Sequence, residues 1–297
     1  MPNLADAPTL MRTAGWVDYA LIDSGGGRKL ERFGSVRVIR PEPQCLWRPA
    51  LAPEVWAAAE AVFEASDEEE AGRWRFARPL PDAWPMAWRD VRFLARPTAF
   101  RHLGLFPEHA SNWGWIVERL TSGSPTKILN LFGYTGIASL VAAARGAMVT
   151  HVDASKKAIA WGKENADASG LAQAPVRWIC EDARKWVERE ARRGARYHAI
   201  ILDPPKYGRG PAGEVWRLYE DLPGLVAGCA GLLEGGAGFL LLNAYSERLS
   251  SLALAGLVAE ATVSLGGRIE FGELGLMEQH GERGIGLSFF ARWSGAK

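Results

Sequence analysis

The segment Lys127-Ile128-Leu129-Asn130-Leu131-Phe132, followed by Gly133-Tyr134-Thr135-Gly136, decides the fold class. Its apolar run is typical of a buried strand, and the run 137–144 that follows is typical of a helix. Glycines between a strand and a helix let the backbone turn tightly and lie against a ligand. The spacing is not that of the full dinucleotide fingerprint, G-x-G-x-x-G. The segment therefore predicts the first strand, turn and helix of a doubly wound α/β sheet.

The second predicted strand, 148–153, ends in an acid, Asp153, which lies 20 residues beyond Gly133. An acid at that distance can accept hydrogen bonds from ribose hydroxyls. Asp153 could instead cap a helix that begins near Ser155. The glycine turn upstream favours the ribose role.

The third predicted strand, 176–180, is followed by Glu181-Asp182-Ala183. In the same architecture, this acid pair would lie over the base of a nucleoside-like cofactor, where Asp182 could accept from an exocyclic amine. An acid at a helix N-terminus is favoured by the macrodipole and explains Asp182 equally well. Both interpretations stay open at this position.

The fourth predicted strand, 199–202, leads into Asp203-Pro204-Pro205-Lys206-Tyr207. Ligands of open α/β sheets bind at the carboxyl ends of the strands, where this segment falls. Two consecutive prolines fix φ and remove two donors, while their carbonyls still accept. The turn thus presents acceptors beside the Asp203 carboxylate, which suits an amino group whose lone pair must be aimed at an electrophile. An ordinary strand-ending turn is the alternative.

The remaining strand candidates are 237–242, 268–274 and 286–293. The polar linker 278–283 between the last two leaves no room for a crossover helix. A hairpin is therefore expected, and with it an antiparallel last strand.

Taken together, these motifs resemble those of class I S-adenosylmethionine-dependent methyltransferases. More narrowly, 130–136 and 203–207 resemble the bacterial large-subunit (23S) ribosomal RNA methyltransferase group, which contains cytosine C5 and guanine N-methylating members. The resemblance covers about residues 105–293. It implies an α/β fold with a doubly wound, seven-stranded, Rossmann-like sheet whose last strand is antiparallel.

The resemblance also implies a site for S-adenosylmethionine. Gly133 and Gly136 would lie at its methionine part, Asp153 at the ribose and Asp182 at the adenine, and 106–109 resembles a family segment that closes over the cofactor. The expected cofactor-binding residues are Phe106, Glu108, Asn130, Phe132, Gly133, Tyr134, Thr135, Gly136, Asp153, Ala154, Ser155, Glu181, Asp182, Ala183 and Asp203. The residues expected to face the target are Asp203, Pro204, Pro205, Lys206 and Tyr207, and no metal is expected.

The residue types favour nitrogen methylation over cytosine C5 methylation. One feature departs from the nitrogen-methylating pattern: amino-methylating enzymes commonly have an aromatic directly after Asp-Pro-Pro, whereas this chain has Lys206, with Tyr207 one place later.

The cysteines argue against the C5 reaction. C5 methylation needs a cysteine that adds covalently to the ring. In that branch the thiol falls near 243–246, and the three cysteines of this chain lie elsewhere.

Composition bounds the partners and the compartment. A chain of 297 residues can hold one large or two modest domains. Its formal net charge of +1 gives no overall positive field to attract nucleic acid, which weakens the case for an RNA partner without excluding one. Three cysteines without a pairing pattern, no signal peptide and no membrane-length apolar run predict a cytoplasmic protein without a membrane partner. Oligomeric state stays open.

Residues 1–104 lack strand–helix alternation and are expected to form a smaller, β-rich domain that could recognise substrate or RNA, before a methyltransferase domain at 105–297. Within the smaller domain, 17–23 and 30–39 flank a glycine loop and predict a hairpin, and 54–65 is helix-like.

Seven arginines interleave with aromatic residues between positions 73 and 101. Guanidinium groups for phosphates and rings for unpaired bases would suit single-stranded RNA. Core packing of the rings is the favoured alternative, because strand alternation alone generates this pattern.

The combined prediction is a methyltransferase that modifies a nucleobase nitrogen in RNA, with ribosomal RNA expected by analogy. A protein or small-molecule amine could instead be the acceptor, which the near-neutral charge encourages. A nicotinamide-dependent oxidoreductase is disfavoured by the Gly-x-x-Gly turn. A non-catalytic RNA-binding protein that keeps the fold is supported only by Lys206.

Overall fold

The computed structural model of the protein describes residues 2–13, 15–65, 72–120, 126–245 and 248–296. Its helices are α1 (Pro53–Ala57), α2 (Ala110–Arg119), α3 (Ile137–Ala143), α4 (Lys156–Ala168), α5 (Ala183–Arg192), α6 (Leu218–Leu232) and α7 (Ser251–Ala261), with 3-10 turns η1 (Pro107–His109) and η2 (Val263–Leu265).

The described chain forms two compact units. One comprises residues 1–11, 112–274 and 287–297, and the other comprises 12–111 and 275–286. The sequence predicted one boundary near residue 104, and the proposed division of function between the two ranges stays a prediction.

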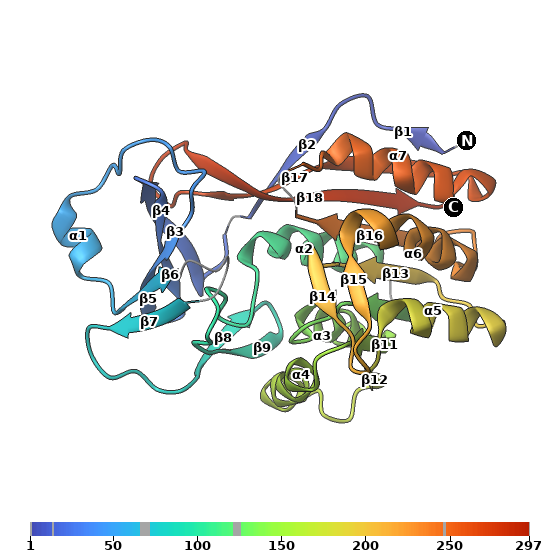
Figure 1. The fold of residues 1–297 in the computed structure, drawn as a ribbon, viewed down its shortest axis with the longest axis horizontal. Helices are drawn as coiled ribbons and strands as arrows, with labels where there is room; N and C mark the ends of the chain where they lie inside the picture. The colour runs from blue at the N-terminus through green and yellow to red at the C-terminus, as the bar shows by residue number, and fades with distance from the viewer. Residues whose placement is uncertain (1, 14, 66–71, 121–125, 246–247, 297) are drawn as a thin grey trace. The chain divides into compact units, whose positions relative to one another are not determined.

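The large sheet has the strand order β1-β17-β18-β16-β13-β10-β11-β12, with β2 also paired to β17 (Figure 1). Its strands are β1 (Asn3–Leu4), β2 (Thr9–Thr13), β10 (Lys127–Leu131), β11 (Met148–Asp153), β12 (Val176–Cys180), β13 (Ala199–Leu202), β16 (Phe239–Ala244), β17 (Arg268–Met277) and β18 (Gly284–Ser294). The strands β10 to β13 and β16 run parallel, and β18 runs antiparallel to β16. The predicted doubly wound sheet with its antiparallel last strand is confirmed. Strands β1 and β2 were not predicted, because such short segments carry no periodic signal.

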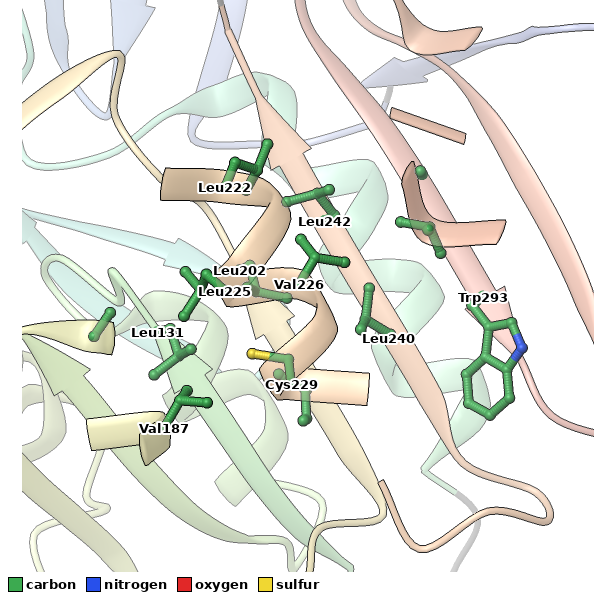
Figure 2. Close-up of a cluster of buried hydrophobic side chains, with 14 of the residues drawn as sticks. Leu131, Val187, Leu202, Leu222, Leu225, Val226, Cys229, Leu240, Leu242 and Trp293 are labelled. Atoms are coloured by element: carbon green, nitrogen blue, oxygen red, sulfur yellow. The ribbon is translucent and has the colours of Figure 1, made fainter. Parts of the chain in front are cut away.

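Helices cover both faces of this sheet because side chains of successive strand residues point to opposite faces. Leu202 and Leu242 join a cluster with α5, α6 and α7, as Figure 2 shows for its α6 side. Their neighbours Ile201 and Leu241 join a second cluster with α2 and α3. Central strands buried on both faces explain the continuous apolar runs in the sequence.

The smaller unit contains a sheet of order β3-β4-β5-β6-β7 and a separate hairpin, β8–β9. These strands are β3 (Tyr19–Gly25), β4 (Arg28–Phe33), β5 (Val36–Pro41), β6 (Ala61–Ala65), β7 (Gly72–Phe76), β8 (Trp84–Trp88) and β9 (Val91–Ala95). The predicted strand 30–39 is in fact two strands, because Gly34 adopts a φ of +60° and turns the chain between them. The predicted helix 54–65 is also wrong in its second half, which is β6. The acidic run 67–70 lies outside the described residues.

Part of the arginine- and aromatic-rich stretch serves packing in this unit. Trp84, Trp88 and Phe93 are buried. Arg73 and Arg75 both form ion pairs with Glu64, at 3.0 and 2.9 Å. For these residues the structure favours the packing interpretation of the stretch.

Replacing Leu225 with alanine tests the α6 side of the core. Leu225 is 3% exposed, and the change should lower the free energy of unfolding by about 2–5 kcal/mol, through lost burial and a cavity. Leu252→Ala in α7 is the matched control, since this helical leucine is 59% exposed and should lose at most about 0.5 kcal/mol. Urea denaturation followed by tryptophan fluorescence measures both. Equal losses would show that the packing is misassigned.

Candidate active site

The glycine turn joins β10 to α3 at the carboxyl edge of the sheet. Gly136 is the N-cap residue of α3, with a left-handed φ of +80°. Phe132 and Tyr134 also have positive φ, 55° and 49°, although neither is glycine. Such conformations cost about 1–3 kcal/mol each and cluster at ligand sites. Thr135 is buried, and its carbonyl accepts a hydrogen bond from Asn165 Nδ2 at 2.9 Å.

Three buried polar side chains, those of Asn130, Ser139 and His151, are hydrogen-bonded in a row beneath this turn, and His151 explains why position 133 is a glycine. A Cβ on Gly133 would lie 2.3 Å from Cε1 of His151. Nδ1 of His151 lies 3.0 Å from Ser139 Oγ, which accepts from Asn130 Nδ2 at 2.8 Å. Asn130, predicted at the cofactor, is 2% exposed and supports the turn from below.

Asp153 ties the glycine turn to the start of α4. Its Oδ2 accepts from the Tyr134 amide and its Oδ1 accepts from the Ser155 amide, both at 2.8 Å. Ser155 is itself the N-cap of α4, accepting from the Ala158 amide at 3.2 Å. Asp153 therefore does not cap this helix. Each of its carboxylate oxygens can accept a second hydrogen bond. Burial raises the pKa of Asp153.

The acid pair after β12 has partners within the protein. Asp182 is the N-cap residue of α5 and accepts from the amides of Arg184 and Lys185, at 2.9 and 3.1 Å. Glu181 forms an ion pair with Arg189 at 2.6 Å. The capping role of Asp182 is thus present, and its role at the adenine stays a prediction, as do those of Glu181 and of the buried Ala183.

Asp203 and the prolines follow β13, the neighbour of β10. The parallel register pairs Leu131 with Leu202, so the turns after the two strands lie side by side. Pro204 is buried, whereas Pro205, Lys206 and Tyr207 are exposed. The Pro205 carbonyl accepts from Trp216 Nε1 at 2.7 Å, which ties this turn to the segment that follows it.

A hairpin that the sequence did not reveal follows the prolines. It consists of β14 (Tyr207–Arg209) and β15 (Val215–Arg217), in antiparallel register. Trp216 is 3% exposed, and its ring centroid lies 4.9 Å from that of Phe132 in the glycine turn. One side chain therefore contacts both turns. The glycines between 208 and 213 carry the turn signal that could have indicated the hairpin.

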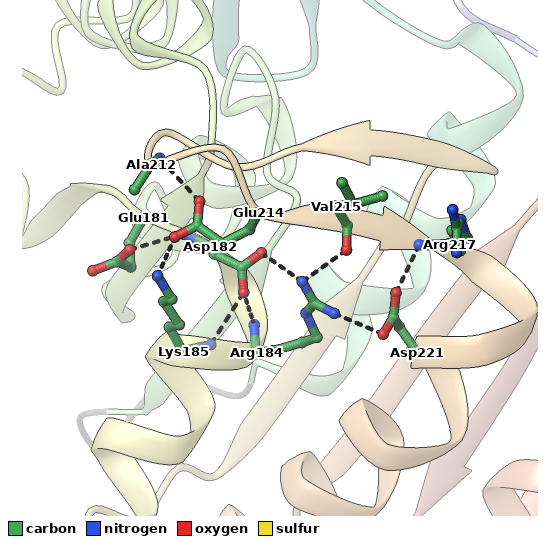
Figure 3. A network of polar contacts seen from close by, with 9 residues as sticks. All are labelled: Glu181, Asp182, Arg184, Lys185, Ala212, Glu214, Val215, Arg217 and Asp221. Carbon is green, nitrogen blue, oxygen red and sulfur yellow. Dashed lines mark hydrogen bonds and ion pairs between the residues drawn. The ribbon is translucent and has the colours of Figure 1, made fainter.

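An ion pair and a hydrogen bond fasten this hairpin to the N-terminus of α5, and a second ion pair joins α5 to Asp221 of α6 (Figure 3). Arg184 donates to Asp221 Oδ1 at 2.6 Å and to the Val215 carbonyl at 2.9 Å. Lys185 forms an ion pair with Glu214, whose Oε2 also accepts from the Ala212 amide at 2.9 Å. The hairpin and the acid pair after β12 thus share one polar network.

The two remaining predicted residues lie in the smaller unit. Phe106 is the N-cap residue of η1, and its ring centroid lies 4.6 Å from that of His102. Glu108 is 8% exposed within η1. Their role at the cofactor stays a prediction.

Other kinds of site were sought over the same parts of the chain. Within the described ranges there is no group of three or more His, Cys, Asp and Glu side chains that could hold a metal ion. Among the described helices, none has the length and apolar character needed to cross a bilayer.

A strained glycine turn, an acid on the next strand and a second acidic turn, all at the carboxyl edge of a doubly wound sheet, are typical of nucleoside-cofactor enzymes of the α/β class. Comparisons with known proteins narrow this class. The solved SAM-dependent methyltransferase from Agrobacterium tumefaciens is 48% identical, with a TM-score of 0.95, and the similarity covers 99% of this chain and 95% of that one. The chain therefore belongs to the S-adenosylmethionine-dependent methyltransferases, and S-adenosylmethionine is its cofactor.

Other matches cover shorter parts of the chain. Residues 110–219 match the family model described as conserved hypothetical protein 95. The ribosomal RNA large subunit methyltransferase K/L of Pseudoalteromonas translucida is 38% identical over 105 residues, which is 35% of this chain and 14% of that protein. Its counterpart from Shewanella frigidimarina is 32% identical over 158 residues, 52% of this chain and 21% of that protein. The chain thus spans less than a quarter of the length of these two relatives.

The buried His151 predicts a pH dependence of stability. Burial lowers its pKa from 6.5 to about 3, so between these values the unfolded chain takes up a proton that the folded protein does not. Stability is therefore lost as the pH falls through this window. Between pH 7 and pH 5, the wild type should lose about 2 kcal/mol more than His151→Gln. Urea denaturation at both pH values measures the difference, and parallel losses in the two proteins would refute the assignment.

Removing the hydrogen bond from Trp216 Nε1 to the Pro205 carbonyl should make the backbone of this turn open more often. Trp216→Phe keeps a ring against Phe132 but removes the donor to the Pro205 carbonyl. Losing about 1 kcal/mol locally should speed amide exchange in 206–208 about fivefold, without global unfolding. Hydrogen–deuterium exchange mass spectrometry measures this, with peptides from β11 as the internal control. Unchanged exchange at 206–208 would mean that the indole N–H does not hold this turn.

Proposed function

We propose that this methyltransferase methylates a nucleobase nitrogen in RNA, with ribosomal RNA as the substrate class. The observation that carries the proposal is the position of the Asp203-Pro204-Pro205 turn, beside the strained glycine turn on the neighbouring strand. The names of the curated relatives point to ribosomal RNA, although this chain matches only part of each of them.

Several residues suit the cofactor. Gly133 and Gly136 allow the tight path of the turn, because a Cβ on either would clash with His151 or Trp178. Asp153 can accept further hydrogen bonds from ribose hydroxyls. Asp182 offers acceptor oxygens beside its capping bonds. When bound, S-adenosylmethionine supplies a methyl group on an already activated sulfonium. The chain itself then has to bind the cofactor and the target base, orient the target nitrogen toward the methyl group and exclude water.

The target amine would be oriented by Asp203 and the carbonyl of Pro204. Both lie directly after β13, and two prolines in succession make the turn stiff. Hydrogen bonds from the amine to these acceptors would aim its lone pair, and such positioning contributes several kcal/mol to catalysis. Tyr207 is 52% exposed and offers a ring on which a base can stack.

The cysteines support nitrogen over cytosine C5 as the acceptor atom. Asn243 lies one residue beyond Leu242, which pairs with Leu202, and so occupies the edge position beside Asp203. It is buried and accepts from Asn112 Nδ2 at 2.6 Å. Burial raises the pKa of Cys229, and that of Cys45 to about 11, so neither is an activated nucleophile.

The proposal includes a compartment and a role for the smaller unit. All three cysteines are free, which fits a reducing cytoplasm where ribosomal RNA is modified. Phe76 and Phe100 are 44% and 53% exposed on the smaller unit, which could contribute to RNA recognition. Its buried aromatics could not.

Nucleoside mass spectrometry of ribosomal and transfer RNA, from cells with and without the gene, tests the proposed function. A methylated nucleoside should disappear on deletion and return when purified protein and labelled S-adenosylmethionine are added to the deletion-strain RNA. The nucleoside should carry its methyl on nitrogen. Unchanged RNA and no label transfer, despite cofactor binding, would refute the proposal and favour a protein or small-molecule amine.

Asp203→Asn should lower the rate of methyl transfer about 100-fold, because the amide no longer offers the same pair of acceptors to the target amine. The affinity for S-adenosylmethionine should change less than about tenfold, since the glycine turn and Asp153 are untouched. Single-turnover transfer to deletion-strain RNA and calorimetric cofactor binding measure the two quantities. A variant as fast as the wild type would remove Asp203 from the target site.

A further inference from the structure

We infer that the outer face of the β14–β15 hairpin binds the single-stranded RNA that flanks the target base. This inference rests on the proposed function and adds the surface that would hold its substrate. The outer hairpin face consists of the four exposed side chains of the two strands: Tyr207, Arg209, Val215 and Arg217.

Strand alternation separates this face from the buried one. In the antiparallel register, Trp216 pairs with Gly208, and Trp216 is buried against Phe132. The residues on either side of each therefore point the other way, toward solvent. Tyr207 begins the hairpin only two residues beyond Pro205, so the outer hairpin face is continuous with the target turn.

Two acids near the hairpin, Glu214 and Asp221, are engaged with bases from α5, and the outer hairpin face itself carries two arginines and no acid. Glu214 forms an ion pair with Lys185, and Asp221 forms one with Arg184 at 2.6 Å (Figure 3). Their side chains are only 10% and 20% exposed. Arg209 is exposed and has no ion pair with any described residue.

Arg217 has one partner that a phosphate could displace. Its Nη1 lies 3.2 Å from Glu220 Oε2, and the two side chains are 60% and 65% exposed. Exposed pairs of this kind contribute only about 0–1 kcal/mol. A phosphate that accepts hydrogen bonds from the guanidinium can compete with such a pair.

The pairing of a ring with a guanidinium favours nucleic acid over an acidic protein. Tyr207 lies directly opposite Arg217, and directly opposed side chains in antiparallel strands lie about 5 Å apart at Cβ. A base can then stack on the ring while its phosphate reaches the arginine. An acidic peptide would use the positive charge but not the ring.

The outer hairpin face is also pre-organised. The hydrogen bond from Arg184 to the Val215 carbonyl, the ion pair between Lys185 and Glu214 and the hydrogen bond from Trp216 to Pro205 fix the hairpin before any ligand arrives. A surface held in its binding conformation loses less entropy on association. By contrast, Arg73 and Arg75 of the smaller unit are both paired to Glu64.

Binding of a labelled 20-nucleotide single-stranded RNA, followed by fluorescence anisotropy at several salt concentrations, tests the inference. Arg209→Gln should weaken binding about tenfold at low salt and reduce the slope of log affinity against log salt by about 1. Tyr207→Leu should weaken binding at least about fivefold with little change in that slope. Affinity for S-adenosylmethionine should be unchanged in Arg209→Gln.

The matched control is Arg192→Gln at the opposite end of α5. Arg192 is exposed and likewise has no ion pair with any described residue, so its loss should leave RNA affinity unchanged. If Arg209→Gln bound RNA as Arg192→Gln does, the inference would be wrong. Two further results together would contradict the inference: displacement of the RNA by poly-glutamate of equal total charge, and wild-type RNA affinity in Tyr207→Leu. They would indicate an acidic protein partner instead.

The failure of the inference can be told apart from that of the proposed function. Normal RNA binding by Arg209→Gln, together with methylation of ribosomal RNA by the wild type, would overturn only the role of the hairpin. A wild type that neither binds nor methylates RNA would overturn both.

Discussion

The parallel pairing of β10 with β13 is the constraint on which the rest of the site depends. It sets Leu131 beside Leu202, and so places the glycine turn and the Asp203-Pro204-Pro205 turn next to each other at one edge. Both strands are buried between layers of helices, so a slip of one residue would move each side chain out of its own packed layer and into the other. The core thus fixes the distance between the part of the chain that suits the cofactor and the part that suits the target.

Trp216 links these two turns through one side chain. Its indole donates to the Pro205 carbonyl and its ring packs on Phe132, whose backbone has positive φ. Beneath the glycine turn, His151 and Ser139 supply a second support. Strain in the turn is therefore held from two sides, which is the condition under which such backbone conformations persist at functional sites.

Much of this architecture could be predicted from the sequence, because buried parallel strands read as continuous apolar runs such as 199–202. The short linker 278–283 similarly indicated the antiparallel last strand. The hairpin at 207–217 was missed because its strands are three residues long, and only one of those side chains, Trp216, is buried. Neither could the sequence show that Asn130 points beneath the turn or that Ser155, not Asp153, caps α4. The position of Asn130 depends on side-chain packing between separate segments, which local patterns do not encode. The cap of α4 is local, but Asp and Ser are both common N-cap residues, so the sequence alone does not choose between Asp153 and Ser155.

A crystal structure of the protein with S-adenosylhomocysteine tests the central claim most directly. The account predicts the ribose hydroxyls within hydrogen-bond distance of Asp153, and the sulfur between the glycine turn and Asp203. A cofactor bound away from the carboxyl edge of β10 and β13, or with its sulfur turned from Asp203, would contradict the assignment of both turns.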